Sequence, residues 1–440
     1  MNIKGLSFSS LPIFLIAIIV NACGGAPNQE KLAGERIAVL EFEEGIKVDP
    51  ELADLEVALP VAYRNSEWKQ PGGNSVNAPG HLELKGFTPL FKEKVAIATT
   101  EERRIFAPPI IANGLIFIMG ANLDVHAFDA KTRKKKWIRD FVPRNGVLKE
   151  GFGGGLAYGE ENLFVTTGFG NLTALNPKTG ETIWEVKSDI IFRAPPLIEG
   201  GRVYVLSNDN QLQVYSEKDG GFLWSHTGII EPATILGAPS PAVLGEVVIV
   251  GYSSGEIYNL LAINGTQNWT DTLLRKGKVT PISSVNSITA RPVIDGNLII
   301  TTSHGGRMAA MDVLRGERLW TQDIASLQTP AVSGYFIFVV TIDAKLICII
   351  RNTGRVKWVE QLPQFKDVVR QEKPIEWNGP VLAGEKLILT STEGDVATFS
   401  PQTGKLMEDH YISEPITLPP VIADGVLYIL SDHGTLFAFQ

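Results

Sequence analysis

The chain has 440 residues, of which 44% are hydrophobic and 20% are charged, and it contains 43 glycines and 26 prolines. This composition supports a large core with many turns, and it excludes an intrinsically disordered chain. The formal net charge is −8, so we expect no nucleic-acid partner bound through a broad basic surface.

Residues 1–22 are predicted to be a lipoprotein signal peptide. Lys4 precedes the apolar run 11–20, which is too short to span a bilayer as a mature helix. The run ends in Val-Asn-Ala-Cys23, which resembles a bacterial lipoprotein cleavage box and implies that Cys23 becomes the acylated first residue. Gly24 follows, and by resemblance to the sorting rule of enteric bacteria it indicates the outer membrane. The alternative is an ordinary signal peptide or an uncleaved anchor with an incidental cysteine.

Residues 23–60 are predicted to be a lipid-anchored tether and lead segment, because they match the later repeats poorly. Within this segment, residues 37–42 are expected to form a short strand and residues 49–59 a short helix. The stretch 68–74 is then expected to lead into a further strand at residues 89–97.

Residues 61–440 are predicted to be a propeller because one unit, seen at residues 291–320, is repeated along them. Short β-prone runs alternate with turns that contain Gly or Asn, and this pattern predicts four antiparallel strands joined by hairpins. A tryptophan in the last strand recurs every 38 to 51 residues, the period of a four-stranded blade. The eight copies begin at Pro109, near Gly155, and at Pro196, Pro241, Pro292, Pro330, Pro380 and Pro420. The aromatic position holds Trp137, Trp184, Trp224, Trp269, Trp320 and Trp358, with Met407 in the seventh copy.

The eighth copy supplies three strands before Gln440. A blade left open would expose a row of unpaired backbone groups. The stretch 89–97 resembles the missing strand, with Phe91 in the aromatic position. We therefore predict an all-β fold, an eight-bladed β-propeller with four antiparallel strands per blade, whose ring is closed by an N-terminal strand.

Three further features are predicted to be structural. Cys348 lies in an apolar run and is expected to be a buried packing thiol, and acylation of Cys23 would leave it no disulfide partner. His304 and His433 occupy equivalent turns of two repeats, which favours a structural role over metal ligation. The basic cluster 133–136 is predicted to be an exposed hairpin.

The signal with Cys23, the lead ending at Pro60, the stretch 68–74 and the eight repeats together resemble the BamB family, the propeller lipoproteins of the outer-membrane β-barrel assembly (BAM) machinery. The resemblance covers residues 23–440. It implies a non-enzymatic scaffold that is lipid-anchored at the periplasmic face of the outer membrane. Its implied partners are the periplasmic (POTRA) domains of BamA, other BAM subunits and unfolded outer-membrane proteins, whose insertion it assists.

The resemblance also implies where the partner binds. Docking in this family is attributed to loops between blades, which correspond here to residues 230–237 and 283–290. The implied partner-binding residues are Ile235, Leu236, Ser287 and Thr289. Ile235 matches an apolar family position, whereas Leu236 stands in place of an arginine, and Ser287 and Thr289 stand in place of acidic residues. The alternative is that both loops only connect blades.

A quinoprotein dehydrogenase is the alternative from another class, because it shares the propeller plan. Such an enzyme stacks a quinone and binds calcium, and often has a disulfide between adjacent cysteines. This chain has no adjacent cysteines and no Asp-x-Asp-x-Asp-Gly calcium loop. We therefore predict no catalytic residue, cofactor or metal site. A third alternative is a propeller whose central channel binds a small periplasmic molecule or a glycan.

Overall fold

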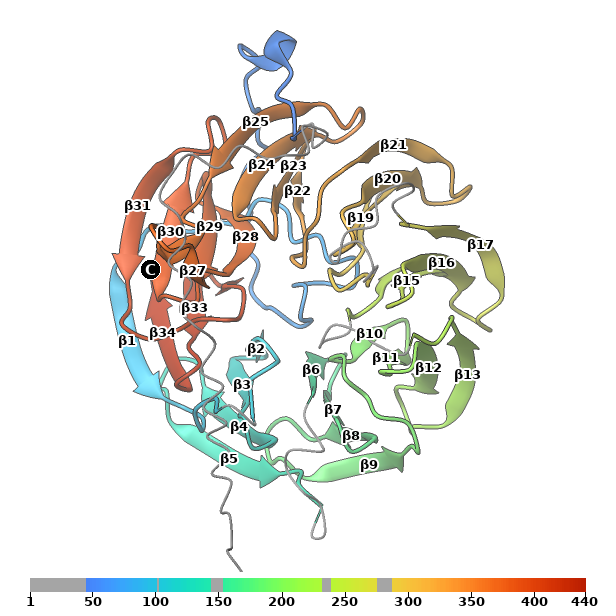
Figure 1. Ribbon diagram of the computed structural model, residues 1–440. Helices are drawn as coiled ribbons and strands as arrows, with labels where there is room; N and C mark the ends of the chain where they lie inside the picture. The colour runs from blue at the N-terminus through green and yellow to red at the C-terminus, as the bar shows by residue number, and fades with distance from the viewer. Residues whose placement is uncertain (1–44, 101–102, 144–152, 232–238, 275–286) are drawn as a thin grey trace, which may run out of the picture. The chain divides into compact units, whose positions relative to one another are not determined.

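The computed structural model describes residues 45–100, 103–143, 153–231, 239–274 and 287–440. Within these ranges, eight antiparallel sheets of four strands follow one another and form the blades of a propeller (Figure 1). The predicted all-β, eight-bladed fold is therefore confirmed. The same ranges contain no helix of the length and hydrophobicity needed to cross a bilayer.

Blades 1 to 4 coincide with the first four predicted copies, and each blade runs from its innermost to its outermost strand. Their strands are β2 (Ile110–Ala112), β3 (Leu115–Met119), β4 (Asp124–Asp129) and β5 (Lys135–Asp140) in blade 1, β6 (Gly154–Tyr158), β7 (Leu163–Thr167), β8 (Asn171–Leu175) and β9 (Thr182–Lys187) in blade 2, β10 (Leu197–Glu199), β11 (Arg202–Leu206), β12 (Gln211–Ser216) and β13 (Phe222–Thr227) in blade 3, and β14 (Ala242–Leu244), β15 (Val247–Gly251), β16 (Glu256–Leu261) and β17 (Gln267–Thr272) in blade 4.

Blades 5 to 8 continue this order, except that the outermost strand of blade 8 comes from the N-terminal part of the chain. Their strands are β18 (Val293–Asp295), β19 (Leu298–Thr302), β20 (Met308–Asp312) and β21 (Arg318–Gln322) in blade 5, β22 (Ala331–Ser333), β23 (Phe336–Val340), β24 (Lys345–Ile350) and β25 (Val356–Gln361) in blade 6, β28 (Trp377–Ala383), β29 (Lys386–Ser391), β30 (Asp395–Phe399) and β31 (Leu406–Tyr411) in blade 7, and β32 (Val421–Ala423), β33 (Val426–Leu430), β34 (Thr435–Phe439) and β1 (Pro89–Lys94) in blade 8.

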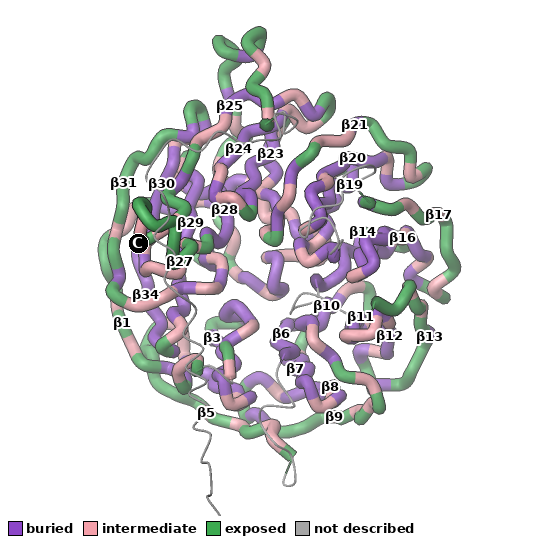
Figure 2. Tube along the Cα trace, viewed as in Figure 1, coloured by how far each residue is buried: buried purple, intermediate pink, exposed green. Residues whose placement is uncertain are grey.

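Burial follows the apolar pattern of the strands. The second strand of a blade packs against other blades on both faces, and β23, which reads Phe-Ile-Phe-Val-Val, is buried along its whole length. An outermost strand such as β9 alternates between exposed and partly buried residues, because one face meets solvent. Figure 2 shows the result, with buried residues on the inner strands and exposed residues at the periphery. Cys348 on β24 is fully buried, which confirms the predicted packing thiol.

Six outermost strands carry a tryptophan that binds the next blade. Each indole Nε1–H donates a hydrogen bond, 2.7–3.2 Å long, to a backbone carbonyl oxygen in the turn between the third and fourth strands of that blade. A glycine with positive φ in the same turn lies against the indole, so that a Cβ on Gly265 would lie 2.4 Å from Cε3 of Trp224. The pairs are Trp137–Gly180, Trp184–Gly220, Trp224–Gly265, Trp269–Gly316, Trp320–Gly354 and Trp358–Gly404.

The ring is closed by β1, which pairs antiparallel with β34, as predicted. Phe91 takes the place of the tryptophan, and Arg133 of blade 1 takes the place of the glycine. The backbone φ of Arg133 is +61°, and its guanidinium lies 5.4 Å from the centre of the Phe91 ring. Lys92 on β1 forms a 2.9 Å ion pair with Glu414. Burial acts to raise the pKa of Glu414, but hydrogen bonds from Ser431, Lys92 and Thr435 outweigh it and lower this pKa from 4.5 to about 2.

Two elements differ from the sequence expectation. The helix expected over 49–59 is limited to the 3₁₀ turn η1 (Pro50–Leu52), where the carboxylate of Asp49 accepts a hydrogen bond from the backbone N–H of Glu51. A hairpin of β26 (Phe365–Asp367) and β27 (Glu372–Pro374), which the repeat does not predict, is inserted between blades 6 and 7. The strand expected over 37–42 lies outside the described residues.

Replacing Gly265 by alanine tests the contact between blades. Alanine pays a conformational cost of about 1–2 kcal/mol at a left-handed backbone position, and it would also collide with Trp224. The matched control is Gly245→Ala in the same blade, where φ is +57° and an added Cβ meets nothing within 4 Å. We expect Gly265→Ala to lower the free energy of unfolding by a further ~1–3 kcal/mol relative to the control, measured by urea denaturation. Equal losses would show that the indole contact contributes nothing.

Candidate functional site

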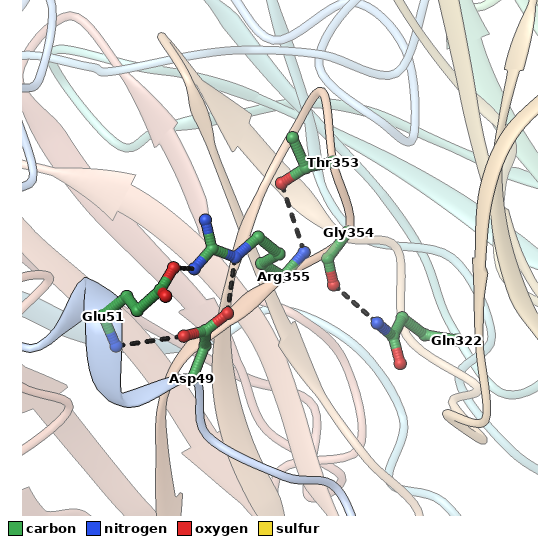
Figure 3. Close-up of polar contacts among 6 residues, drawn as sticks. All are labelled: Asp49, Glu51, Gln322, Thr353, Gly354 and Arg355. Carbon is green, nitrogen blue, oxygen red and sulfur yellow. Dashed lines mark hydrogen bonds and ion pairs between the residues drawn. The ribbon is translucent and has the colours of Figure 1, made fainter.

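Residues 45–60, named the N-terminal arm, are attached to the outer side of blade 6 (Figure 1). The backbone N–H of Asp49 donates a 2.8 Å hydrogen bond to the carbonyl oxygen of Val356. The Arg355 guanidinium lies between the carboxylates of Asp49 and Glu51 (Figure 3), and its Nη2 is 2.6 Å from Glu51 Oε2. The hydrogen bond from Arg355 lowers the pKa of Asp49. Paired charges and backbone bonding therefore fix the arm to this blade.

Residues 61–84, named the channel segment, lie in the central channel and hydrogen-bond to the innermost strands of seven blades. Taken in order, Asn65, Trp68, Lys69, Gln70, Ser75, Val76 and Leu82 contact blades 8, 1, 2, 3, 4, 5 and 7. The remaining blade is reached by the N-terminal arm, since a Cβ on Gly334 of blade 6 would lie 3.2 Å from Cδ of Pro60. The chain thus makes one circuit of the ring from the inside.

The contacts fall on equivalent positions of the repeat. Trp68 exchanges two backbone hydrogen bonds with Ile111, the middle residue of β2, at 2.7 and 3.0 Å. The corresponding N–H groups of Val243 on β14 and Ile294 on β18 donate to carbonyl oxygens of the channel segment at 2.7 and 3.0 Å. Backbone groups on this side of each innermost strand have no neighbouring strand in the blade, so the channel segment supplies the partners that an edge strand lacks.

Two side-chain amides of the channel segment form hydrogen bonds to backbone groups of the blades, as the backbone of the segment does elsewhere. The Gln70 amide donates to the carbonyl oxygen of Ile198 at 2.9 Å and accepts from its N–H at 3.3 Å. The Asn77 amide nitrogen donates to the carbonyl oxygens of Pro241 and Pro292 at 3.1 and 2.9 Å. Both side chains are buried. The repeat pattern places this stretch before the closing strand and does not indicate that it lines the channel. The uncharged amides beside Pro71-Gly72-Gly73 are the sequence signal for that role.

The small cavity beside the channel segment does not fit a quinone. The channel segment fills the channel at one face, and the cavity beside it, lined by Trp68, Arg291 and Pro380 among others, measures about 50 Å³. That volume holds a few water molecules, whereas a fused three-ring quinone is several times larger. Over the part of the chain that the structure describes, no three His, Cys, Asp or Glu side chains are grouped as metal ligands.

The channel segment and the predicted docking loops belong to opposite faces. The channel segment contacts turns between the first and second strands of blades, as Glu67 does at Asn113 and His81 does at Glu385. The connections between successive blades leave from the other ends of these strands, and we name that side the loop face. Residues 230–231 and 287–290 of the predicted docking loops lie in connections between successive blades and therefore on the loop face, whereas residues 232–237 and 283–286 lie outside the described residues.

The structure describes part of the predicted docking residues. Ile235 and Leu236 lie outside the described residues. Ser287 is 1% exposed, and its carbonyl oxygen accepts a 3.0 Å hydrogen bond from the backbone N–H of His304. Thr289 is partly buried. The assignment of these four residues to partner binding stays a prediction.

A polar cluster holds the beginning of the first loop. The backbone N–H of Ile229 donates to the Glu256 carboxylate at 3.0 Å, and the Tyr258 hydroxyl donates to the same carboxylate at 2.9 Å. His226 Nδ1 lies 2.8 Å from the Tyr252 hydroxyl. Burial lowers the pKa of His226, against the opposing effect of Glu256, and burial raises the pKa of Tyr252. The cluster fixes the backbone at a point from which apolar side chains project into solvent.

Exposed apolar side chains occur in several of the connections on the loop face. Ile229 and Ile230 are 60% and 64% exposed, and Val368 and Val369 at the tip of the β26–β27 hairpin are 76% and 95% exposed. Ile191, Leu274 and Leu327 in other connections are also exposed. Large apolar groups exposed together mark interaction surfaces. The hairpin was missed, although 50 residues separate Pro330 from Pro380 where 40 separate Pro380 from Pro420.

Replacing Gln70 by methionine tests the attachment of the channel segment. The change keeps the side-chain length but leaves the N–H and carbonyl of Ile198 unpaired in a buried place, so we expect a loss of about 2 kcal/mol in the free energy of unfolding. A loss in urea titrations of no more than roughly 0.5 kcal/mol, the size typical of a surface substitution, would contradict the lining role.

Comparison with known proteins gives relatives that include outer membrane protein assembly factors. The family described as outer membrane protein assembly factor BamB matches residues 121–360. The protein of that name from Moranella endobia is 21% identical over 334 residues, which covers 75% of this chain and 84% of the relative. The one from Yersinia pestis is 23% identical over 322 residues, which covers 72% of this chain and 79% of the relative.

Two solved structures show the same fold. The crystal structure of BamB from Moraxella catarrhalis has a TM-score of 0.66 at 17% identity and covers 81% of this chain and 100% of its own. A quinohemoprotein alcohol dehydrogenase from Comamonas testosteroni has a TM-score of 0.65 at 12% identity, covering 86% of this chain and 81% of its own, and shares the fold alone. The family match extends over more than half of the sequence. The chain therefore belongs to the family of the outer membrane protein assembly factor BamB.

Proposed function

We propose that this protein is a non-enzymatic scaffold of the outer-membrane β-barrel assembly machinery, and that it binds the periplasmic domains of BamA through its loop face. The observation that carries the proposal is the exposure of Ile229 and Ile230 at the start of the first predicted docking loop. These side chains project from backbone that Glu256 fixes, so their burial against a partner costs little ordering of the loop base.

The proposed docking surface extends from Ile229 and Ile230 to Ile235, Leu236 and Thr289. Apolar contact supplies most of the affinity in this proposal, because Leu236 and Thr289 carry no charge where the family has an arginine and an acid. Ser287, which is buried, contributes by holding the second loop through its bond to His304. Other subunits and unfolded outer-membrane proteins are further proposed partners, at surfaces that these residues do not define.

We also propose that Cys23 carries the lipid that anchors the protein to the periplasmic face of the outer membrane. The support is the sequence Val-Asn-Ala-Cys23 at the end of a short apolar run. Burial of acyl chains supplies about 0.8 kcal/mol per methylene, so anchoring needs no membrane-spanning helix.

Replacing Cys23 by serine tests the anchor. We expect the variant to incorporate no labelled palmitate and to leave the membrane fraction, because the acceptor sulfur is gone. Cys348→Ser, at the buried cysteine, is the matched control and should label like the unmodified protein. Label that persists in Cys23→Ser would refute the assignment.

The docking surface is tested by Ile229→Asp combined with Ile230→Asp. Burying a carboxylate without a partner is costly, and the loss of two apolar contacts adds about 1–3 kcal/mol each when they lie near the centre of an interface. We expect at least a roughly tenfold weaker affinity for the purified periplasmic domains of BamA, measured by biolayer interferometry. Both positions are exposed, so the melting temperature should stay unchanged.

The control variant is Ile263→Asp combined with Leu314→Asp. These residues are 62% and 73% exposed in turns of blades 4 and 5 on the face away from the loops. The control should bind BamA like the unmodified protein. Unchanged binding by the Ile229/Ile230 variant, or an equal loss in the control, would place docking elsewhere on the molecule. Ile235→Asp with Leu236→Asp then tests the rest of the proposed surface in the same assay.

A further inference from the structure

The cavity in the central channel, named the channel cavity, is lined by a cationic side chain that no described carboxylate balances. It lies between the channel segment, which contributes Trp68, and the beginnings of the innermost strands of blades 5 to 8, which contribute Arg291, Thr329 and Pro420. Its volume is about 50 Å³, and most of its lining is apolar. Arg291 is the single charged residue among the described side chains that line it.

Arg291 stands at a repeated position. In seven of the eight copies one residue directly precedes the proline that begins the copy, and these residues are Pro108, Pro195, Ser240, Arg291, Thr329, Gly379 and Pro419. Six of the seven carry no charge. The repeat therefore gives no packing reason for a guanidinium in blade 5, because proline, serine, threonine or glycine occupies this position in the other copies.

The guanidinium of Arg291 is poorly compensated by the protein. Its side-chain hydrogen bond is a 3.5 Å contact from Nη1 to Thr329 Oγ1, at the limit of hydrogen-bond length. No carboxylate among the described residues pairs with it, and its Nε is buried with no hydrogen-bond partner among them. Burial lowers the pKa of Arg291 from 12.5 to about 10, which leaves it charged at neutral pH. Arg291 is partly exposed as a residue, but a largely desolvated cation without a counter-ion still costs the fold stability.

A second donor lines the same cavity. Trp68 is 4% exposed, and its indole Nε1–H has no hydrogen-bond partner among the described residues. The Trp68 backbone is held to blade 1 by two hydrogen bonds, so the ring is fixed in place. A fixed cation and a fixed neutral donor at one small cavity are complementary to a negatively charged ligand.

We propose that the channel cavity binds one small monovalent anion, a halide or a short carboxylate, with Arg291 as its counter-charge and Trp68 as a second donor. The cavity volume limits the ligand to a few heavy atoms. The bound anion would connect the channel segment to blade 5 and so stabilise the closed ring. This inference concerns the channel and is independent of docking at the loop face.

The experiment uses the full mature chain crystallised in sodium bromide, with data collected at the bromine absorption edge. We expect an anomalous peak beside Arg291 that is absent in Arg291→Gln. An ordered water in place of the peak, or a peak that persists in Arg291→Gln, would overturn the proposal. Adding formate to the bromide crystals shows which class of anion the site prefers. Formate displaces bromide and removes the peak if the site prefers a short carboxylate, and the peak remains if the site prefers a halide.

Solution measurements keep the test independent of crystals. A ligand that binds the folded state raises its stability with concentration, so added sodium bromide should raise the melting temperature of the unmodified protein relative to that of Arg291→Gln in the same salt. The rise should be retained in Arg315→Gln, an exposed arginine of the same blade, and lost in Arg291→Gln. If Arg291→Gln does not fold, Trp68→Phe, which removes only the second donor, should show a smaller rise than the unmodified protein. An equal rise in all variants would contradict the site.

Discussion

The indole that each of six blades presents to its neighbour is the contact on which the ring depends. A blade buries its inner strands only when another blade covers them, and the tryptophan fixes the distance and rotation between the two because it makes an apolar contact and a directed hydrogen bond together. The glycine opposite it is required, since a side chain there would occupy the space of the ring. At the closing blade this pair becomes Phe91 and Arg133, so a cation over an aromatic face replaces the indole and its hydrogen bond.

The inside of the ring poses a separate problem, which the channel segment solves. Propeller blades converge on an axis where innermost strands have unpaired edges, and water or a ligand usually satisfies them. In this protein the chain itself does so, through backbone at Trp68 and Ser75 and through the amide of Gln70. The channel segment occupies the channel from one face, and the opposite face carries the exposed side chains of Ile229, Ile230 and the hairpin tip.

The blades were predictable from sequence because their signals are local. Turn glycines, apolar runs of five residues and a tryptophan at a steady period each report on the strand that contains them, and the same logic found Phe91 as the closing residue. The channel segment was not predictable in this way. Gln70 and Asn77 bind backbone atoms of residues more than 100 positions away. Every residue type has the same backbone groups, so no sequence pattern marks the partners of these two amides. The residues of the docking loops were inferred from family resemblance. The exposure of Ile229 and the burial of Ser287 could not be predicted, because they depend on packing and not on residue type.

The route of the N-terminal residues sets the order in which the molecule can be completed. Asn65 bonds to Ile422, which lies 357 positions later in the chain, and β1 pairs with β34 near the other end. Asn65 and β1 therefore reach their final places only when the last blade has formed. Contacts between such distant parts of a chain form slowly, and until they form both the inner strand edges and the outer edge of blade 8 stay open to other chains. The same two contacts that complete the ring thus also remove its exposed strand edges.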